Sequence, residues 1–150
     1  MKVNRRTRRR GFTLIELLVV LVILALLAGI VLPKFLNRAG EAQVKAAITQ
    51  ISNFKSALSL YSLDNSGPPS TQQGLDALIA EPTSSPRPVK WSGPYMEGIQ
   101  AIPKDPWGND WIYEAPGPDG EDFFIMSYGK DGREGGSGED ADITSNQAQQ

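Results

Sequence analysis

The sequence predicts an α+β protein in which a long N-terminal helix packs on a small antiparallel β-sheet. Three observations predict this class. An apolar run occupies 12–32, an apolar repeat of helical period continues to residue 63, and short runs rich in β-branched and aromatic residues follow after residue 108. A helical pattern segregated from the strand pattern is typical of α+β folds, because each amphipathic element buries its apolar face against the other.

The apolar run extends from Phe12 to Leu32 and contains a single charged residue. As a helix it would be about 31 Å long, which matches the hydrocarbon core of a bilayer. A cleaved secretory signal is the alternative, but the run exceeds an ordinary signal core and no small-x-small cleavage site follows it. We therefore expect a transmembrane helix at 12–32.

The charges of the chain are distributed unevenly around this run. The chain has 15 basic and 17 acidic residues, yet residues 1–11 hold six basic residues and no acid. Only Lys34 and Arg38 lie close behind the run. Positive charge stays on the cytoplasmic side, so we expect a cytoplasmic N-terminus and the bulk of the chain across the membrane. A basic run can also bind nucleic acid, but its position beside the apolar run favours membrane topology.

Glu16 is the charged residue inside the apolar run. An ionised carboxylate in lipid costs roughly 3 kcal/mol or more unless it is paired. One alternative is that the side chain reaches the headgroups, since Glu16 lies near the end of the span. The other is a cation supplied by a neighbouring copy, because cleavage after Gly11 would leave an α-ammonium at Phe12 at a similar depth.

A second helical pattern follows at 33–63. Pro33 either kinks a continuous helix or ends the transmembrane span, and the pattern leaves both open. A continuous helix from Phe12 to Leu63 would be about 78 Å long and would stop at the breaker DNSGPP. The apolar residues recur at steps of three and four, which predicts one buried face: Val44, Ile48, Ile51, Phe54, Leu58 and Tyr61.

Residues 64–108 are rich in proline and glycine and predict an ordered connecting region. A short helix is expected at Gln72–Ala80, capped by Ser70 or Thr71. A segment of this composition is disordered unless apolar anchors hold it. It offers six: Leu75, Leu78, Ile79, Trp91, Tyr95 and Ile102.

The β-rich region spans 109–143. Trp111–Glu114 and Phe123–Met126 predict two strands joined through a tight loop of Pro, Gly and Asp as a hairpin. A further strand is expected around Gly98–Ile102. Residues 144–150 are polar and predict a frayed tail.

A glycine-rich acidic loop at 127–142 closes this region and carries five acids within twelve residues. Carboxylates this close repel one another unless a cation bridges them. Oxygen ligands without His or Cys suit Ca²⁺, although the spacing is not that of an EF-hand. A solvated loop without metal is the alternative that composition leaves open.

The composition excludes several kinds of chemistry. The chain has no Cys and no His. Disulfides, thiolate or imidazole metal sites, and Cys–His or Ser–His–Asp catalysis are therefore excluded. Pairs of acids can act as acid and base, but here they lie in a glycine-rich loop, so we do not expect an enzyme or catalytic residues.

The heptapeptide Arg10-Gly-Phe-Thr-Leu-Ile-Glu16 resembles the processing site of type IV pilin-like proteins, in which a basic leader ends in Gly, Phe follows, and Glu is fifth after the cut. The resemblance implies that a prepilin peptidase removes the leader 1–11 by cutting between Gly11 and Phe12, and methylates the Phe12 amine. It also implies that Glu16 is the assembly carboxylate and that the helix continues, kinked, through Pro33.

Three further motifs are similar to those of the major (G-type) pseudopilins of type II secretion systems: Asp105-Pro-Trp-Gly-Asn109, Ser127-Tyr-Gly-x-Asp-Gly132 and Glu139-Asp-Ala-Asp-Ile143. The similarity runs from Gly11 to Ile143 and implies a pilin-like fold with one Ca²⁺ in the acidic loop. It implies a ligand set of Asp131, Asp140 and Asp142 carboxylates, the carbonyl of Tyr128 and one near Ser137. The chain departs from the family after Ile143, where an aromatic residue is common.

The resemblance implies a structural subunit that polymerises into the periplasmic pseudopilus, the filament that drives export of folded proteins by type II secretion. The implied setting is the inner membrane, with the C-terminal domain in the periplasm. The implied partners are further copies of the chain, minor pseudopilins, prepilin peptidase, an inner-membrane assembly platform and membrane lipid, but no nucleic acid. The alternatives are a type IV pilin of a surface fibre, which often has a Cys pair, and a signal-anchored periplasmic binding module, which needs no Gly–Phe cut.

Overall fold

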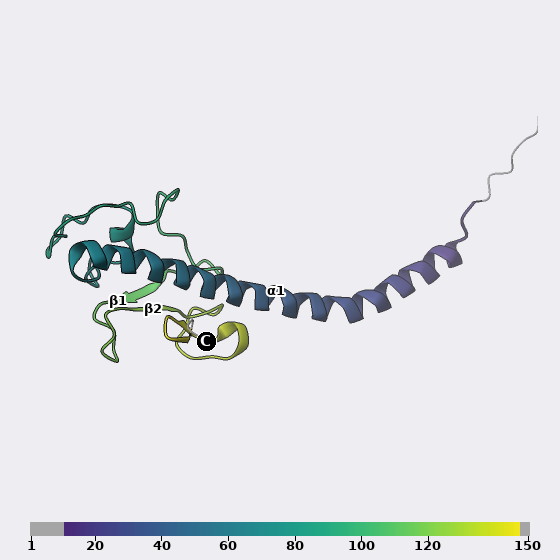
Figure 1. Cartoon of the computed structure of the whole chain (residues 1–150). Helices are drawn as coiled ribbons and strands as arrows, with labels where there is room; N and C mark the ends of the chain where they lie inside the picture. Colours follow the sequence, from purple (N-terminus) through teal and green to yellow (C-terminus); the bar gives the residue numbers. More distant parts are fainter. Residues whose placement is uncertain (1–10, 148–150) are drawn as a thin grey trace, which may run out of the picture. The chain divides into compact units, whose positions relative to one another are not determined.

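The computed structural model describes residues 11–147, apart from the side chains of 32–37. The predicted leader, except Gly11, and residues 148–150 of the predicted tail lie outside the described residues. The elements are, in order, α1 (Leu14–Asn65), the 3₁₀ helix η1 (Leu75–Leu78), β1 (Ile112–Glu114), β2 (Phe124–Ser127), the 3₁₀ helix η2 (Gly138–Asp140) and β3 (Ile143–Thr144) (Figure 1). One long helix and a small antiparallel sheet confirm the predicted α+β class.

Helix α1 is a single element of 52 residues. It includes position 33, so the continuous helix, one of the two alternatives for Pro33, is the one observed. Both of its bounds lie two residues closer to the C-terminus than the predicted Phe12–Leu63. Contacts divide the chain into a helical unit that ends at Ala39 and a compact unit that begins at Gly40.

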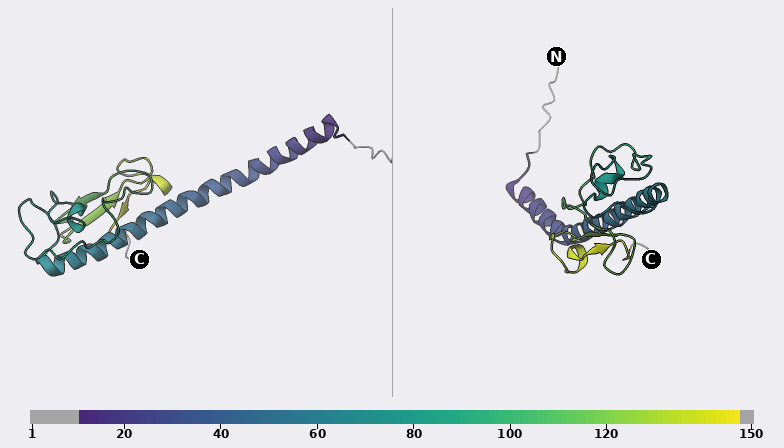
Figure 2. Two further views of the ribbon diagram at one scale, coloured as in Figure 1. Left: turned by 90° about the horizontal axis from the view of Figure 1, so that it is seen from above. Right: turned by 90° about the vertical axis from the view of Figure 1, so that its left-hand side faces the viewer.

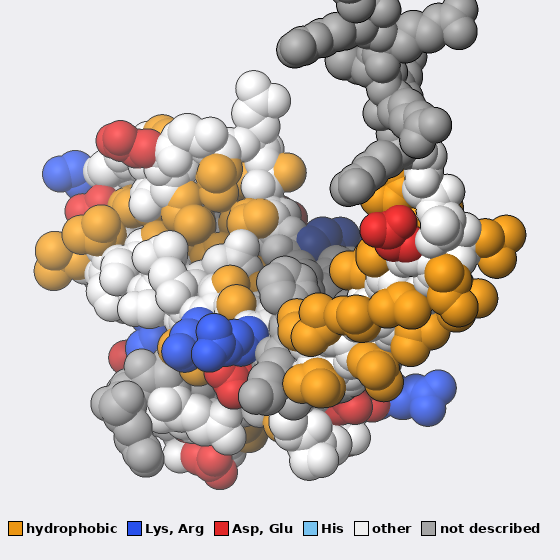
Figure 3. Space-filling model, turned by 90° about the vertical axis from the view of Figure 1, so that its right-hand side faces the viewer, with side chains coloured by type: hydrophobic (Ala, Val, Ile, Leu, Met, Phe, Trp, Pro, Cys, Tyr) orange, Lys and Arg blue, Asp and Glu red, His pale blue; other side chains and the backbone are white. Residues whose placement is uncertain are grey.

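The helical unit presents an apolar surface. The segment Leu14–Val31 is long and apolar enough to cross a membrane, and none of its 18 residues is buried within the chain. Figure 3 shows hydrophobic side chains gathered over this part of the helix. A helix that is apolar on all sides is stable only where lipid or other protein surrounds it.

The compact unit buries one face of α1. Ile51, Phe54 and Leu58 are fully buried there, as predicted. Ile48 was expected on the same face, but its side chain is 37% exposed, whereas the neighbouring Ala47 is fully buried. The prediction for Ile48 is wrong because hydrophobicity was used to choose between two adjacent positions. The direction that each position faces on the helix decides burial instead, and a small Ala lets the covering layer approach.

The sheet has the strand order β1-β2-β3 and lies along the C-terminal part of α1 (Figures 1 and 2). The predicted hairpin is confirmed: β1 and β2 are antiparallel, with Tyr113 opposite Ile125. The third strand is not at Gly98–Ile102 as predicted. It is the two-residue β3, whose Ile143 pairs with Ser127.

The connecting region is ordered by side chains that reach back to it. The buried amide of Gln73 donates to the carbonyls of Ser84 (3.2 Å) and Pro86 (2.6 Å). The Trp91 indole N–H donates to the Ala77 carbonyl at 3.0 Å. The helix predicted at Gln72–Ala80 is shortened to η1, because Gly74 precedes it with a φ of 63° and breaks the helical path. Of the two proposed caps, Ser70 accepts a hydrogen bond from the Gln73 N–H through its hydroxyl.

The start of the predicted tail is not frayed. Thr144 belongs to β3, and Ser145 is only 2% exposed. The Ser145 N–H donates to the Ile125 carbonyl (2.8 Å), and its hydroxyl accepts from the Ile125 N–H (3.2 Å). Polarity alone suggested fraying, but a polar residue is buried stably where its donor and acceptor both find partners.

Two neighbouring isoleucines of α1, Ile48 and Ile51, provide a test of this packing. Ile51→Ala should lower the free energy of unfolding by about 2–5 kcal/mol, because it opens a cavity in the core. The matched Ile48→Ala should cost only about 0.5 kcal/mol, as expected at a surface position. Chemical denaturation monitored by tryptophan fluorescence measures both, and equal losses would contradict the observed orientation of the helix.

Candidate functional site

The first candidate site is the N-terminal end of α1. Thr13 precedes the helix, and its hydroxyl accepts a hydrogen bond from the Glu16 backbone N–H at 3.2 Å. In return, the Glu16 carboxylate accepts from the Thr13 N–H at 3.5 Å. This reciprocal arrangement is a capping box, which satisfies two N–H groups that the helix cannot pair internally.

The capping box adds a third role for Glu16 to the two alternatives considered from sequence, and it brings in Thr13, which the sequence analysis missed. The signal was present as the spacing Thr-x-x-Glu ahead of an apolar run. The two hydrogen bonds orient the carboxylate but leave its charge in place. Phe12 is 79% exposed, and the space around Gly11 is open, so the predicted scissile bond is accessible within the described chain.

The second candidate site is the acidic loop between β2 and β3. The Asp131 carboxylate accepts the Arg133 N–H (3.1 Å), and the Asp142 carboxylate accepts the Gly135 N–H (3.0 Å). The Asp140 N–H donates to the carbonyl of Ser137 at 3.2 Å. Four of the five predicted ligand residues therefore take part in hydrogen bonds within the loop, and Tyr128 lies at its beginning.

The structure does not bring the three predicted carboxylates together. Within residues 11–147, no group of three or more acidic side chains is close enough to hold one metal ion. One observation nevertheless fits a cation: Oδ1 of Asp142 is buried and has no hydrogen-bond partner among the described residues. Oxygen donors from carboxylates and carbonyls are the kind that Ca²⁺ prefers, so the donor chemistry fits although the carboxylates do not converge.

Glu139 lies differently from the other acids of the loop. Its carboxylate is 3.0 Å from the ammonium of Lys130, and this hydrogen bond raises the pKa of Lys130. The Glu139 side chain also occupies the space that a Cβ on the buried Gly40 would need. A glycine in α1 therefore lets the acidic loop rest directly on the helix.

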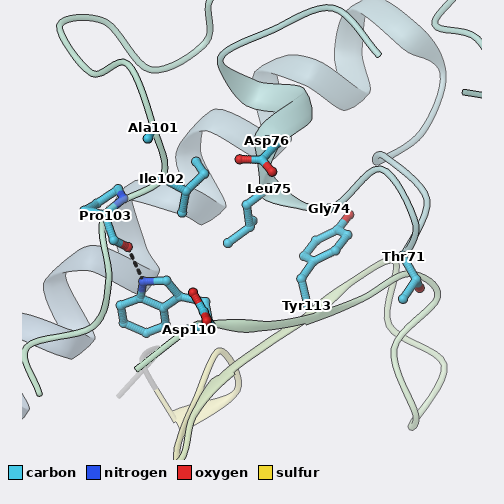
Figure 4. A pocket seen from close by; sticks show the side chains of 10 residues that line it. Thr71, Gly74, Leu75, Asp76, Ala101, Ile102, Pro103, Asp110 and Tyr113 are labelled. Carbon is cyan, nitrogen blue, oxygen red and sulfur yellow. Dashed lines mark hydrogen bonds between the residues drawn. The ribbon is translucent and has the colours of Figure 1, made fainter. Parts of the chain in front are cut away.

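A concavity of the compact unit lies elsewhere, between η1 and β1. It has a volume of about 350 Å³, and Leu75, Ile102 and Tyr113 line it together with Asp76 and Asp110 (Figure 4). Asp110 is engaged in an ion pair with Lys104. Trp111 closes one side, and its indole N–H donates to the Pro103 carbonyl at 2.9 Å. None of the predicted site residues lines this pocket.

The backbone at Gly129 passes close to the far end of the loop and yields a prediction. A Cβ there would lie 2.7 Å from the Glu139 carbonyl oxygen and 2.8 Å from that of Ala141, at a φ of 66°. Gly138 has the same φ but open space around it, which makes it a matched control.

Gly129→Ala should lower the free energy of unfolding by about 2–4 kcal/mol, through backbone strain and overpacking together. Gly138→Ala should cost about 1 kcal/mol, from strain alone. Thermal unfolding of both variants measures the difference, and equal costs would show that the close approach at Gly129 is not formed.

Two family models match adjoining stretches of the chain. The family model for protein G of the type II secretion system (T2SS) matches residues 34–146, and the model of the prokaryotic N-terminal methylation motif matches residues 6–32. The chain is 47% identical over 140 residues to the type II secretion system core protein G of Pseudomonas aeruginosa, covering 93% of this chain and 96% of that protein. It is 44% identical over 142 residues to the Vibrio cholerae protein, covering 93% of each.

The fold has a counterpart among solved structures. The crystal structure of the major pseudopilin from the type 2 secretion system of enterohaemorrhagic Escherichia coli matches with a TM-score of 0.59 and 32% identity, over 73% of this chain and 90% of that one. Sequence, motif and fold therefore agree, and the chain belongs to the protein G family of type II secretion systems, the major pseudopilins.

Proposed function

We propose that this chain is the repeating subunit of a pseudopilus, a helical filament that drives export of folded proteins through the type II secretion system. Family membership over most of the chain carries this function. The long apolar helix joined to a compact unit is the architecture that such a filament needs. The role is structural: the subunit supplies cohesion and length rather than chemistry.

The subunit starts as a membrane protein anchored by Leu14–Val31, with its compact unit in the periplasm. The basic leader keeps the N-terminus on the cytoplasmic side of the inner membrane. A prepilin peptidase then cuts between Gly11 and Phe12 and methylates the new amine, in keeping with the N-terminal methylation motif at 6–32. The exposed Phe12 supports access to this bond.

Assembly depends on the charge of Glu16. The hydrogen bond that its carboxylate accepts from the Thr13 N–H comes from a neutral group and supplies no counter-charge. Burying that charge costs roughly 3 kcal/mol or more, whereas an ammonium from the Phe12 terminus of a neighbouring copy would neutralise it. Electrostatic pairing therefore selects the register in which a new subunit joins.

Helix packing supplies the remaining cohesion. The uncovered apolar side chains of α1 exchange lipid contacts for contacts with neighbouring copies as subunits leave the membrane. A contact between different surfaces of identical copies does not close on itself but repeats with a rise and a rotation, which produces a fibre. Minor pseudopilins at the tip and an inner-membrane assembly platform at the base are the further partners of this scheme.

Calcium is proposed as the ligand of the acidic loop. Asp131, Asp140 and Asp142 are the carboxylate ligands, with the carbonyls of Tyr128 and Ser137. The buried Asp142 Oδ1, which has no hydrogen-bond partner in the described chain, supports this assignment. Glu139 is engaged with Lys130, which favours Asp140 as the neighbouring ligand. A bound cation would offset the repulsion among these acids and hold the loop on α1.

The pairing argument predicts that Glu16→Gln abolishes or strongly reduces filament formation. The amide keeps the size of the side chain but loses the charge that pairs with the neighbouring amine. Filaments are counted by electron microscopy of cells that express the secretion system. Intact mass of the membrane protein shows in the same sample whether the leader is removed and Phe12 is methylated.

The control for this variant is Glu41→Gln, which removes an exposed acid of α1 outside the apolar segment and should leave assembly unchanged. Normal filaments from Glu16→Gln would refute the pairing. A parent protein recovered with residues 1–11 attached would refute the processing step.

The calcium assignment predicts that Ca²⁺ raises the melting temperature of the full chain in detergent micelles. At a Ca²⁺ concentration 100 times the dissociation constant, the free energy of unfolding should rise by about 2.7 kcal/mol. Asp142→Asn should remove most of this gain, whereas Asp119→Asn, at an exposed turn outside the loop, should retain it. Identical melting curves of the parent in Ca²⁺ and in chelator would remove the assignment.

A further inference from the structure

We propose that Asp105 and Asn109 are positioning residues for the acidic loop: together they set the backbone at Gly129, and with it the base of the calcium site, before the cation binds. The motif Asp105-Pro-Trp-Gly-Asn109 has no part in the function proposed above. The inference rests on the calcium assignment and adds to it the residues that prepare the site.

Asp105 is a buried carboxylate that organises its own turn. It is 4% exposed, and its Oδ1 accepts the backbone N–H groups of Trp107 (3.0 Å) and Asn109 (2.7 Å). The turn is closed by main-chain bonds from the Asp105 N–H to the Asn109 carbonyl and from the Gly108 N–H to the Asp105 carbonyl, both 3.0 Å. The side chain of Asn109 is therefore held in one direction.

The same carboxylate ties this turn to the end of β2. Its Oδ2 accepts the hydroxyl of the fully buried Ser127 at 2.6 Å. That hydroxyl accepts the Gly129 N–H at 3.1 Å, and the Asn109 amide donates to the Gly129 carbonyl at 2.9 Å. Both backbone polar groups of Gly129 are thus held by side chains that Asp105 orients.

Gly129 is the point where the two ends of the acidic loop meet. The carbonyl oxygens of Glu139 and Ala141 occupy the space that a Cβ on Gly129 would need, and the next residue, Lys130, donates its N–H to the Glu139 carbonyl at 2.9 Å. The predicted ligands Tyr128 and Asp131 belong to the end of the loop that follows β2, close to Gly129 in the sequence. Asp140 and Asp142 belong to the end that precedes β3. A shift of the backbone at Gly129 therefore changes the distance between these two halves of the ligand set.

The nature of the network favours positioning over simple stabilisation. A buried carboxylate is costly unless hydrogen bonds satisfy it, and a packed apolar side chain often stabilises a core equally well. All three hydrogen bonds that the Asp105 carboxylate accepts come from neutral donors, which fix its direction. The Gly129 N–H, which the Ser127 hydroxyl accepts, belongs to the same peptide group as the proposed Tyr128 carbonyl ligand. Residues that hydrogen-bond to metal ligands typically change metal affinity about 10–100-fold when they are mutated.

The test compares Asn109→Ala with Asp110→Asn in the full chain in detergent micelles. Asn109→Ala removes the donor to Gly129 but leaves the buried carboxylate and its backbone bonds in place. Asp110→Asn changes an exposed acid of the same segment that pairs with Lys104. Calorimetric titration with Ca²⁺ gives the dissociation constant, and thermal unfolding in chelator and in Ca²⁺ gives the calcium-dependent shift.

The expected result is calcium binding at least about tenfold weaker in Asn109→Ala, with a reduced calcium-dependent shift, and no change in Asp110→Asn. A variant that is less stable in chelator and in Ca²⁺ by the same amount, with unchanged affinity, would overturn the positioning role and leave the calcium assignment standing. A parent chain that binds no Ca²⁺ would overturn both. If Asn109→Ala shows no cooperative unfolding, Asn109→Asp, which keeps the size of the side chain but removes the donor, replaces it with the same expected and contrary results.

Discussion

The structure of this protein depends on how the apolar surface of α1 is covered. From Gly40 onward the chain covers it with its own sheet and connecting region, which bury Ile51, Phe54 and Leu58. Over Leu14–Val31 the single chain supplies no cover. Apolar burial contributes about 25 cal/mol per Å², so this surface favours lipid or neighbouring helices over water. One helix therefore needs two kinds of cover: the chain's own residues from Gly40 onward, and lipid or neighbouring helices over Leu14–Val31.

Two carboxylates mark the places where the single chain is incomplete. Glu16 is oriented by its bonds to Thr13 but gains no counter-charge from them. Asp142 buries one oxygen that has no partner in the described part of the chain. A cation would satisfy both: a neighbouring amino terminus in the proposed filament, and Ca²⁺ in the proposed loop site. Both proposals rest on the same principle, the cost of burying a charge without a partner.

Patterns that repeat along the sequence predicted the elements well. The apolar run and the steps of three and four residues predicted α1 to within two residues at each end, and two runs rich in β-formers on either side of a tight loop predicted the β1–β2 hairpin. Choices between neighbouring positions were less secure. Ala47 faces the core in place of Ile48, and β3 at Ile143–Thr144 takes the place expected for Gly98–Ile102. Both outcomes depend on what lies opposite in space, which periodicity does not record.

The sequence by itself determined the transmembrane segment, the long helix, the processing motif and the oxygen-rich character of the acidic loop, because each depends on residues close together in the chain. Only the tertiary structure decided which atoms of that loop are engaged, that Glu139 rests on Gly40, and that Asp105 reaches Gly129 through Ser127 and Asn109. The contacts of Glu139 with Gly40, of Asp105 with Ser127 and of Asn109 with Gly129 join residues about 20 or more positions apart. Their geometry is set by the packing of the sheet on α1, and no local pattern carries that information.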